Sequence, residues 1–212
     1  MAPQRDRTMP LPLLRSLIWI DYRLLVLFAI GMPLVLLVWA SVRQEQALLR
    51  LLGLYAKVAS LLAVTVLLQA DARPLSFITG LVAQLLIPLA LWFWVDINEE
   101  ISDLPSLRPL PLTLRIWRWA LTLLCAAGVV LGTMVISCAW TGATAPACRL
   151  WIEAPQAFHG LLATVLGFLF GAAWTPGLSA VVGYAGLAAY LVGAIQWLLV
   201  RLPRQGRLAG GF

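Results

Sequence analysis

The sequence predicts an all-α fold, a polytopic bundle of transmembrane helices with interfacial helical segments. Two observations carry this prediction. First, 62% of the 212 residues are hydrophobic and only 11% are charged, whereas a soluble domain carries about 25% charged residues. Second, several charge-free stretches reach the length of about 20 apolar residues that crosses a bilayer. These stretches are Leu24–Val42, Leu75–Val95, Trp119–Cys148 and Ala154–Val200, the last with His159 as its only group that ionises near neutral pH.

Five spans are favoured, within three regions of the chain. Residues 1–23 are predicted to form an N-terminal surface segment, residues 24–200 the transmembrane domain, and residues 201–212 a basic C-terminal tail. The segment Ala157–Thr175 is apolar enough to make a sixth span, and we favour a re-entrant or surface position for it. The predicted spans cover about Leu24–Val42, Leu51–Ala70, Leu75–Val95, Trp117–Ala139 and Leu178–Val200.

The 10 tryptophans all fall near the predicted span ends. Indole rings favour the headgroup region of a bilayer, so their positions support the boundaries independently of hydropathy. One interface is predicted to hold Trp39, Trp92, Trp94, Trp117, Trp119 and Trp197, and the other Trp19, Trp140, Trp151 and Trp174.

The 15 basic residues give the chain a net charge of +6. Because they flank apolar segments, we assign them to membrane orientation and anionic headgroups rather than to nucleic acid. Five spans with the N-terminus outside place nine of the 15 inside the cell, and six spans with the N-terminus inside give the same ratio. The nine residues are Arg43, Arg50, Lys57, Arg108, Arg115, Arg118, Arg201, Arg204 and Arg207.

Four carboxylates follow the third predicted span at the spacing of one helical face, namely Asp96, Glu99, Glu100 and Asp103. They lie close in sequence to the predicted interfacial residues Trp117, Arg118 and Trp119. We predict that these seven residues bind a basic protein partner. Carboxylates are also ligands of Mg²⁺ and Mn²⁺, so a divalent metal on this face stays open as an alternative.

Cys138 and Cys148 flank a loop that five spans place in the oxidising compartment. We predict a disulfide between them, which would contribute roughly 3 kcal/mol of stability for a loop of this length. Two free thiols are the alternative. No cofactor is predicted, although His159 leaves pigment binding open as a further alternative. With His159 as the only base on offer and no Gly-x-Ser-x-Gly pattern around Ser179, a serine hydrolase is not favoured.

Glycine pairs and prolines shape the predicted helices. Gly128 and Gly132, four residues apart in the fourth span, would let another helix approach closely. Pro33 and Pro88 lie inside predicted spans and are expected to kink them, because proline lacks the N–H that a helix needs.

Several segments together resemble a family of small cyanobacterial integral membrane proteins of unknown function. The resemblance covers most of residues 19–207 and departs at about residues 160–175, which are more apolar here. It implies five spans and a thylakoid or plasma membrane, and it supplies no catalytic residue. The segments are Trp19–Leu24, Lys57–Leu62, Ile87–Pro105 with its Leu-Trp-Phe-Trp-Val-Asp-Ile-Asn-Glu-Glu core, Trp117–Trp119, Ser137–Ala139, Cys148-Arg149, Trp151–Pro155 and Arg204–Arg207.

These features favour a non-enzymatic accessory or assembly factor for a photosynthetic or other membrane complex. A small transporter or channel is one alternative, with Lys57, Gln69 and Gln84 as the polar side chains available in the spans. A Mg²⁺-dependent enzyme acting on a lipid or isoprenoid through the Asp96–Asp103 carboxylates is another.

Overall fold

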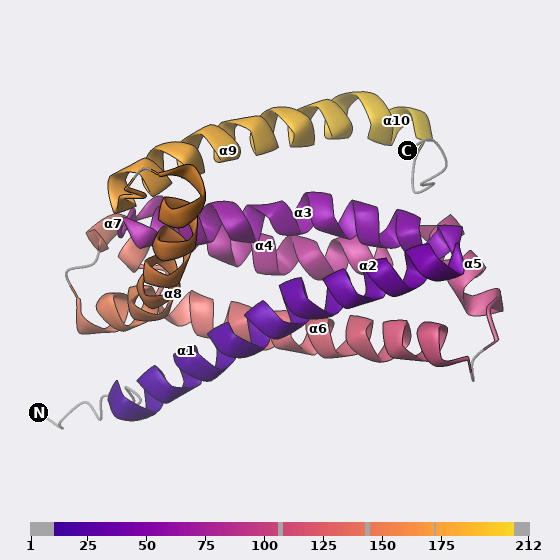
Figure 1. Cartoon of the computed structure of the whole chain (residues 1–212), viewed down its shortest axis with the longest axis horizontal. Helices are drawn as coiled ribbons and strands as arrows, with labels where there is room; N and C mark the ends of the chain where they lie inside the picture. Colours follow the sequence, from indigo (N-terminus) through magenta and orange to yellow (C-terminus); the bar gives the residue numbers. More distant parts are fainter. Residues whose placement is uncertain (1–10, 106–107, 143–144, 172, 206–212) are drawn as a thin grey trace, which may run out of the picture.

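The computed structural model describes residues 11–105, 108–142, 145–171 and 173–205, and these residues form helices without any strand. Figure 1 shows long helices lying side by side in one elongated bundle. The helices are α1 (Leu11–Val26), α2 (Met32–Arg43), α3 (Gln46–Ala70), α4 (Leu75–Trp92), α5 (Val95–Asp103), α6 (Pro109–Met134), α7 (Cys138–Thr141), α8 (Pro146–Phe170), α9 (Pro176–Gln196) and α10 (Leu202–Gln205), with π-helical turns at Leu27–Gly31 and Trp197–Arg201.

Five helical segments of the described chain are long and apolar enough to cross a membrane, which confirms the predicted fold class and the favoured span number. They are Pro12–Arg43, Gln46–Ala70, Leu75–Trp92, Pro109–Met134 and Pro176–Arg204. The protein is therefore a helical membrane protein.

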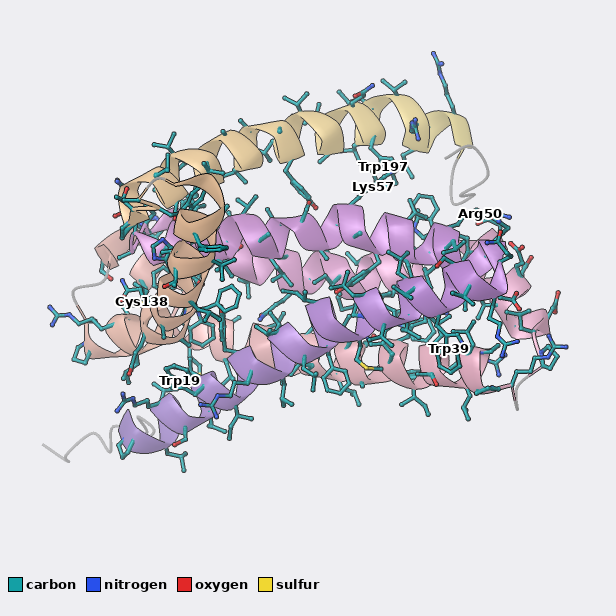
Figure 2. All side chains as sticks on the ribbon, viewed as in Figure 1. Trp19, Trp39, Arg50, Lys57, Cys138 and Trp197 are labelled. Atoms are coloured by element: carbon teal, nitrogen blue, oxygen red, sulfur yellow. A yellow bond between two sulfur atoms is a disulfide. The ribbon has the colours of Figure 1, made fainter. Side chains whose placement is uncertain are left out.

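The bundle has two distinct ends. The end that we call the disulfide end holds the start of α1, the turn between α3 and α4, helices α7 and α8, and the start of α9 (Figure 1). The other, which we call the α5 end, holds the turn between α2 and α3, helix α5, the start of α6, and α10. Figure 2 shows Trp19 towards the disulfide end and Trp39 and Trp197 towards the α5 end, as the two predicted tryptophan groups require.

The first span begins earlier than predicted. The described part of the N-terminal segment, from Leu11 onward, is helical and runs through the π-helical turn into α2 as one continuous rod (Figure 1). Asp21 and Arg23 interrupt the hydropathy but not the helix, because charged side chains are compatible with helical backbone. Residues 1–10 of the predicted surface segment lie outside the described residues.

The fourth span is shifted relative to the prediction. We expected a loop over Pro105–Pro111, but α6 already begins at Pro109. Proline is favoured in the first helical turn, where its missing N–H has no intrahelical partner to lose. The helix then ends at Met134 rather than near Ala139, and a turn at Val135 leads into α7.

Helix α8 contains most of the segment Ala157–Thr175, the possible sixth span. The helix includes residues 157–170 of that segment and has Pro155 in its middle. It is not among the helices that are long and apolar enough to cross a membrane. Figure 1 shows it folded across the disulfide end, in a direction unlike that of the spans. The described part of this segment is thus not a sixth span by length and apolar composition, as the preference for five spans requires.

The core of the bundle forms around α3, which packs against α2, α4, α5, α8 and α9. At the α5 half, fully buried leucines such as Leu36, Leu51 and Leu91 join Trp117 in one apolar cluster. A second cluster around Leu68 packs α3 against α4 and α9. Gly183 of α9 makes that approach possible, because a Cβ there would lie 3.0 Å from Leu68 Cδ2.

Candidate functional site

Helix α5 presents the predicted acidic face at one end of the bundle. The third span does not continue into it, because the backbone of Trp94 is extended and separates α4 from α5. Ile97 and Ile101 are buried at 0% and 2% exposure and join the main apolar cluster. Glu99 and Asp103 are exposed on the opposite side of the helix. The apolar face of α5 thus packs against the rest of the bundle, and its acidic face is exposed.

Arg115 of α6 fastens the C-terminal end of α5. Its Nη2 donates to the carbonyl oxygen of Ile101 at 3.1 Å and to those of Ser102 and Leu104 at 3.4 Å each. Carbonyls in the last turn of a helix lack intrahelical donors, and a cation placed there also interacts favourably with the helix dipole. Arg115 therefore fixes the end of the acidic helix to α6.

Arg118 joins α4, α5 and α6 from inside the bundle. Its Nη2 donates at 2.5 Å both to the carbonyl oxygen of Leu91 and to Oδ1 of Asn98. Its guanidinium lies over the Trp92 ring, 4.1 Å from the ring centre, which is a cation–π geometry. The side chain of Asn98 in turn donates to the Trp92 carbonyl at 3.2 Å. This network ties the break between α4 and α5 to α6.

The structure divides the predicted partner-binding residues into two groups. Trp117 and Arg118 are 1% and 4% exposed. Trp117 donates its ring N–H to the Phe28 carbonyl at 2.7 Å. Because these two side chains are buried within the bundle, they do not belong to the exposed acidic face. Trp119 is 58% exposed and packs against Trp92 with ring centres 5.0 Å apart.

The exposed carboxylates of α5 differ in their surroundings. Glu100 forms an ion pair with Arg50 of α3 at 3.6 Å, with both side chains exposed. Glu99 and Asp103 are exposed, whereas Asp96 is half-buried beside the bundle. Among the residues that the structure describes, no group of three or more His, Cys, Asp or Glu side chains is arranged to hold a metal ion. Helix α5 therefore has an exposed, negatively charged face, without a cluster of metal ligands among the described residues.

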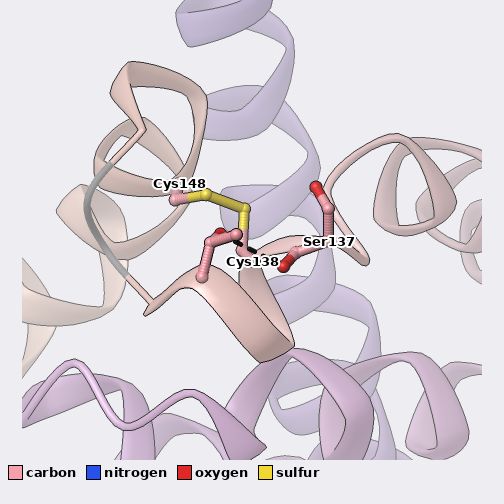
Figure 3. The surroundings of a disulfide bond; sticks show 4 residues. Ser137, Cys138 and Cys148 are labelled. Atoms are coloured by element: carbon pink, nitrogen blue, oxygen red, sulfur yellow. Dashed lines mark hydrogen bonds between the residues drawn. A yellow bond between two sulfur atoms is a disulfide. The ribbon is translucent and has the colours of Figure 1, made fainter.

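The disulfide end is built on the bond between Cys138 and Cys148, the pair that the sequence predicts (Figure 3). The two Cα atoms are 5.7 Å apart and both side chains are buried. The hydroxyl of Thr141 donates to the Ser137 carbonyl at 3.1 Å and closes the single turn of α7. The bond thus fastens the first turn of α8 to α7, directly after the fourth span.

Two further contacts hold α8 across this end. Arg15 of α1 donates to both carboxylate oxygens of Glu153. Such a bidentate pair has charge-assisted hydrogen bonds, which are stronger than neutral ones. His159 and Ser179 share a hydrogen bond of 2.9 Å between Nε2 and Oγ, and both side chains are buried. The Nε2 atom of the sole histidine is thus hydrogen-bonded to Ser179 of α9 within the chain.

The sequence did not reveal that Asn98 and Arg115 position α5. Neither residue is one of the carboxylates of its acidic face. Asn98 has a visible signal, because it lies inside the acidic stretch and just after a predicted span end. The role of Arg115 depends on how α6 folds back beside α5, which has no local signature.

Comparison with protein families gives one match, over residues 15–210, to a family described as a protein of unknown function, DUF3177. Comparisons with curated proteins and with solved structures found no match. The match covers nearly the whole chain, including α5, α8 and the five spans except for the first three residues of the first one. The chain therefore belongs to the DUF3177 family.

Proposed function

We propose that the protein is a non-enzymatic accessory factor that binds a partner subunit of a membrane complex through the acidic face of α5. The observation that carries this proposal is the contrast between the two faces of that helix. Ile97 and Ile101 are buried, while Glu99, Glu100 and Asp103 are exposed.

The support around α5 explains why this face is suited to binding. Arg115 and Arg118 hold the helix at its end and at its start. The carboxylates therefore project from a backbone that is already ordered, which reduces the entropy lost on association. A complementary partner would present Arg or Lys side chains, since charge-assisted hydrogen bonds to carboxylates are stronger than neutral ones.

The membrane and the kind of complex are part of the same proposal. The resemblance to small cyanobacterial membrane proteins supports a thylakoid or plasma membrane, with a photosynthetic or other multi-subunit complex as the partner. Trp119 and Trp92, whose tilted rings contact each other at the same end of the bundle, supply an exposed aromatic surface. Aromatic side chains are enriched in protein interfaces.

The test is partner capture by a charge-neutral variant. Glu99→Gln, Glu100→Gln and Asp103→Asn combined keep side-chain volume and remove three exposed charges. Because each exposed pair contributes about 0.2–1 kcal/mol, the variant should lose about 1–3 kcal/mol of binding energy while inserting normally. Capture from mild detergent, quantified by mass spectrometry, should fall about fivefold or more, and high salt should weaken wild-type capture because exposed charges are screened.

The matched control is Glu45→Gln, which removes a carboxylate at the same end but outside α5. It should leave capture of the same partner unchanged. Undiminished capture by the triple variant would reject the proposal. If that variant instead loses bound divalent metal while keeping its partner, the metal-dependent enzyme becomes the better description.

A further inference from the structure

A small polar cavity lies inside the bundle near the disulfide end, where α1, α3, α4, α6 and α8 meet. Its volume is about 60 Å³. Most of its lining is apolar, including Phe77 of α4 and Trp151 and Pro155 of α8. Five polar side chains interrupt this lining, namely Asp21, Tyr22, Thr65, Gln69 and Gln84. They come from three different spans.

Several of these polar groups have no partner among the described residues. Gln69 and Gln84 are 5% and 7% exposed, and neither side-chain amide makes a hydrogen bond to a described residue. The hydroxyl of Tyr22 is also buried without a partner. Buried polar groups are normally hydrogen-bonded, and the exceptions point to a bound water, an ion or a functional role. These unpaired groups indicate that the cavity holds a water molecule or an ion.

Charge and size restrict what that occupant is. Asp21 is the only charged residue in the lining, and no described cation pairs with it. A carboxylate at membrane depth is costly unless it is neutralised. At about 30 Å³ per water, this volume corresponds to about two water molecules, so a small ion with one water fits it.

We propose that this cavity is a binding site for a small alkali cation of the size of Na⁺. Asp21 supplies the neutralising charge, and the carbonyl oxygens of Gln69 and Gln84 supply neutral ligands. Transporters coordinate Na⁺ through backbone carbonyl oxygens inside the bundle, and here side-chain carbonyl oxygens would take that part. The hydroxyl groups of Tyr22 and Thr65 add two further oxygen atoms to the lining, and that of Thr65 also bonds to the Leu61 carbonyl at 2.8 Å.

The packing of α4 against α6 brings Gln84 into this lining. A Cβ at Gly128 would lie only 2.5 Å from Nε2 of Gln84, so the glutamine side chain occupies the space that this glycine leaves. Gly80 and Gly132 also line the cavity and keep it open. The cavity lies at the opposite end of the bundle from α5, so the cation site stands independently of the proposed partner binding.

The test uses the full-length purified protein in detergent. Thermal unfolding is followed by tryptophan fluorescence while NaCl replaces choline chloride at constant ionic strength, since choline is too large for the cavity. A ligand that binds only the folded state raises the melting temperature in a saturable way. We expect such a rise for the wild type, and about one ²²Na⁺ bound per chain in a direct binding assay.

Asp21→Asn should weaken Na⁺ binding at least tenfold, whereas Asp71→Asn, at the same end but outside the cavity lining, should respond as the wild type.

If Asp21→Asn does not fold, Gln69→Leu provides the second test. It should raise the melting temperature in choline, because a buried unpaired amide is removed, and weaken the response to Na⁺. Identical unfolding in NaCl and choline chloride, without bound ²²Na⁺, would show a cavity that holds water only and would overturn the proposal.

Discussion

At the scale of single residues, Pro33 has an effect that reaches three helices. Proline has no backbone N–H, so the Ala29 carbonyl, four residues earlier, loses its helical donor. Tyr55 of α3 replaces that donor, because its hydroxyl donates to the Ala29 carbonyl at 2.6 Å. Trp117 of α6 donates to the adjacent Phe28 carbonyl at 2.7 Å. Where we predicted a kink, the structure has a π-helical turn whose carbonyls accept hydrogen bonds from two neighbouring spans.

We expect Tyr55→Phe to lower the free energy of unfolding by about 1–3 kcal/mol, because a buried carbonyl loses its only replacement donor. The measurement is reversible unfolding in mixed detergent micelles. Tyr184→Phe is the matched control, since Tyr184 is 42% exposed on α9. Equal effects of the two substitutions would contradict the role assigned to the Tyr55 hydroxyl.

At the scale of helices, α5 and α8 have similar roles at opposite ends of the bundle. Each follows a span, crosses its end, and is fastened by arginine: α5 by Arg115 and Arg118, α8 by Arg15. Helix α8 is further fixed by the disulfide, whereas the described residues at the α5 end contain no disulfide. The disulfide end is thus covalently braced, whereas the α5 end relies on hydrogen bonds and packing.

Denaturing alkylation of membranes that were never reduced should label one of the three cysteines, Cys125, and prior reduction should expose all three. Removing the bond by Cys138→Ser with Cys148→Ser should lower stability by roughly 3 kcal/mol, as the closure of a short loop predicts. The control Cys125→Ala keeps the disulfide and should retain the same difference between reduced and unreduced protein. Three labels without reductant would contradict a disulfide in the cell.

At the scale of the whole molecule, an odd number of spans places the start of α1 and helix α10 on opposite sides of the membrane. Figure 1 shows the start of α1 at the disulfide end and α10 at the α5 end. The nine basic residues assigned to the inside belong to segments at the α5 end or in its half of the bundle, apart from Arg207, which lies outside the described residues. We therefore expect the α5 end to face the cytoplasm.

A reporter enzyme that is active only in an oxidising compartment should stay silent when fused after Phe212 and become active when fused before Met1. A cytoplasmic reporter at the same two positions serves as the control and should give the reverse pattern. Silence of the oxidising-compartment reporter at both ends would mean an even number of spans, with α8 crossing the membrane. It would also remove the compartment argument for the disulfide.

The acidic face shows how far the candidate site follows from sequence. The helical spacing of the carboxylates is a local property, and it predicts their common face correctly. Whether Ile97 faces the bundle or a lipid depends on how α5 folds back, and that is decided by Arg115 and Arg118, which lie on another helix. A sequence pattern gives the faces of a helix but not what each face meets.

The sequence by itself determined the membrane class, the favoured number of spans and the cysteine pair, because hydropathy, helical period and loop spacing are local. Only the tertiary structure decided that Arg118 is internal, that His159 bonds to Ser179, and that Asp21 shares a cavity with Gln69 and Gln84. These groups lie on different helices, and their meeting depends on which helix faces pack together. Close packing at glycines such as Gly128 sets those contacts, and no single segment encodes them.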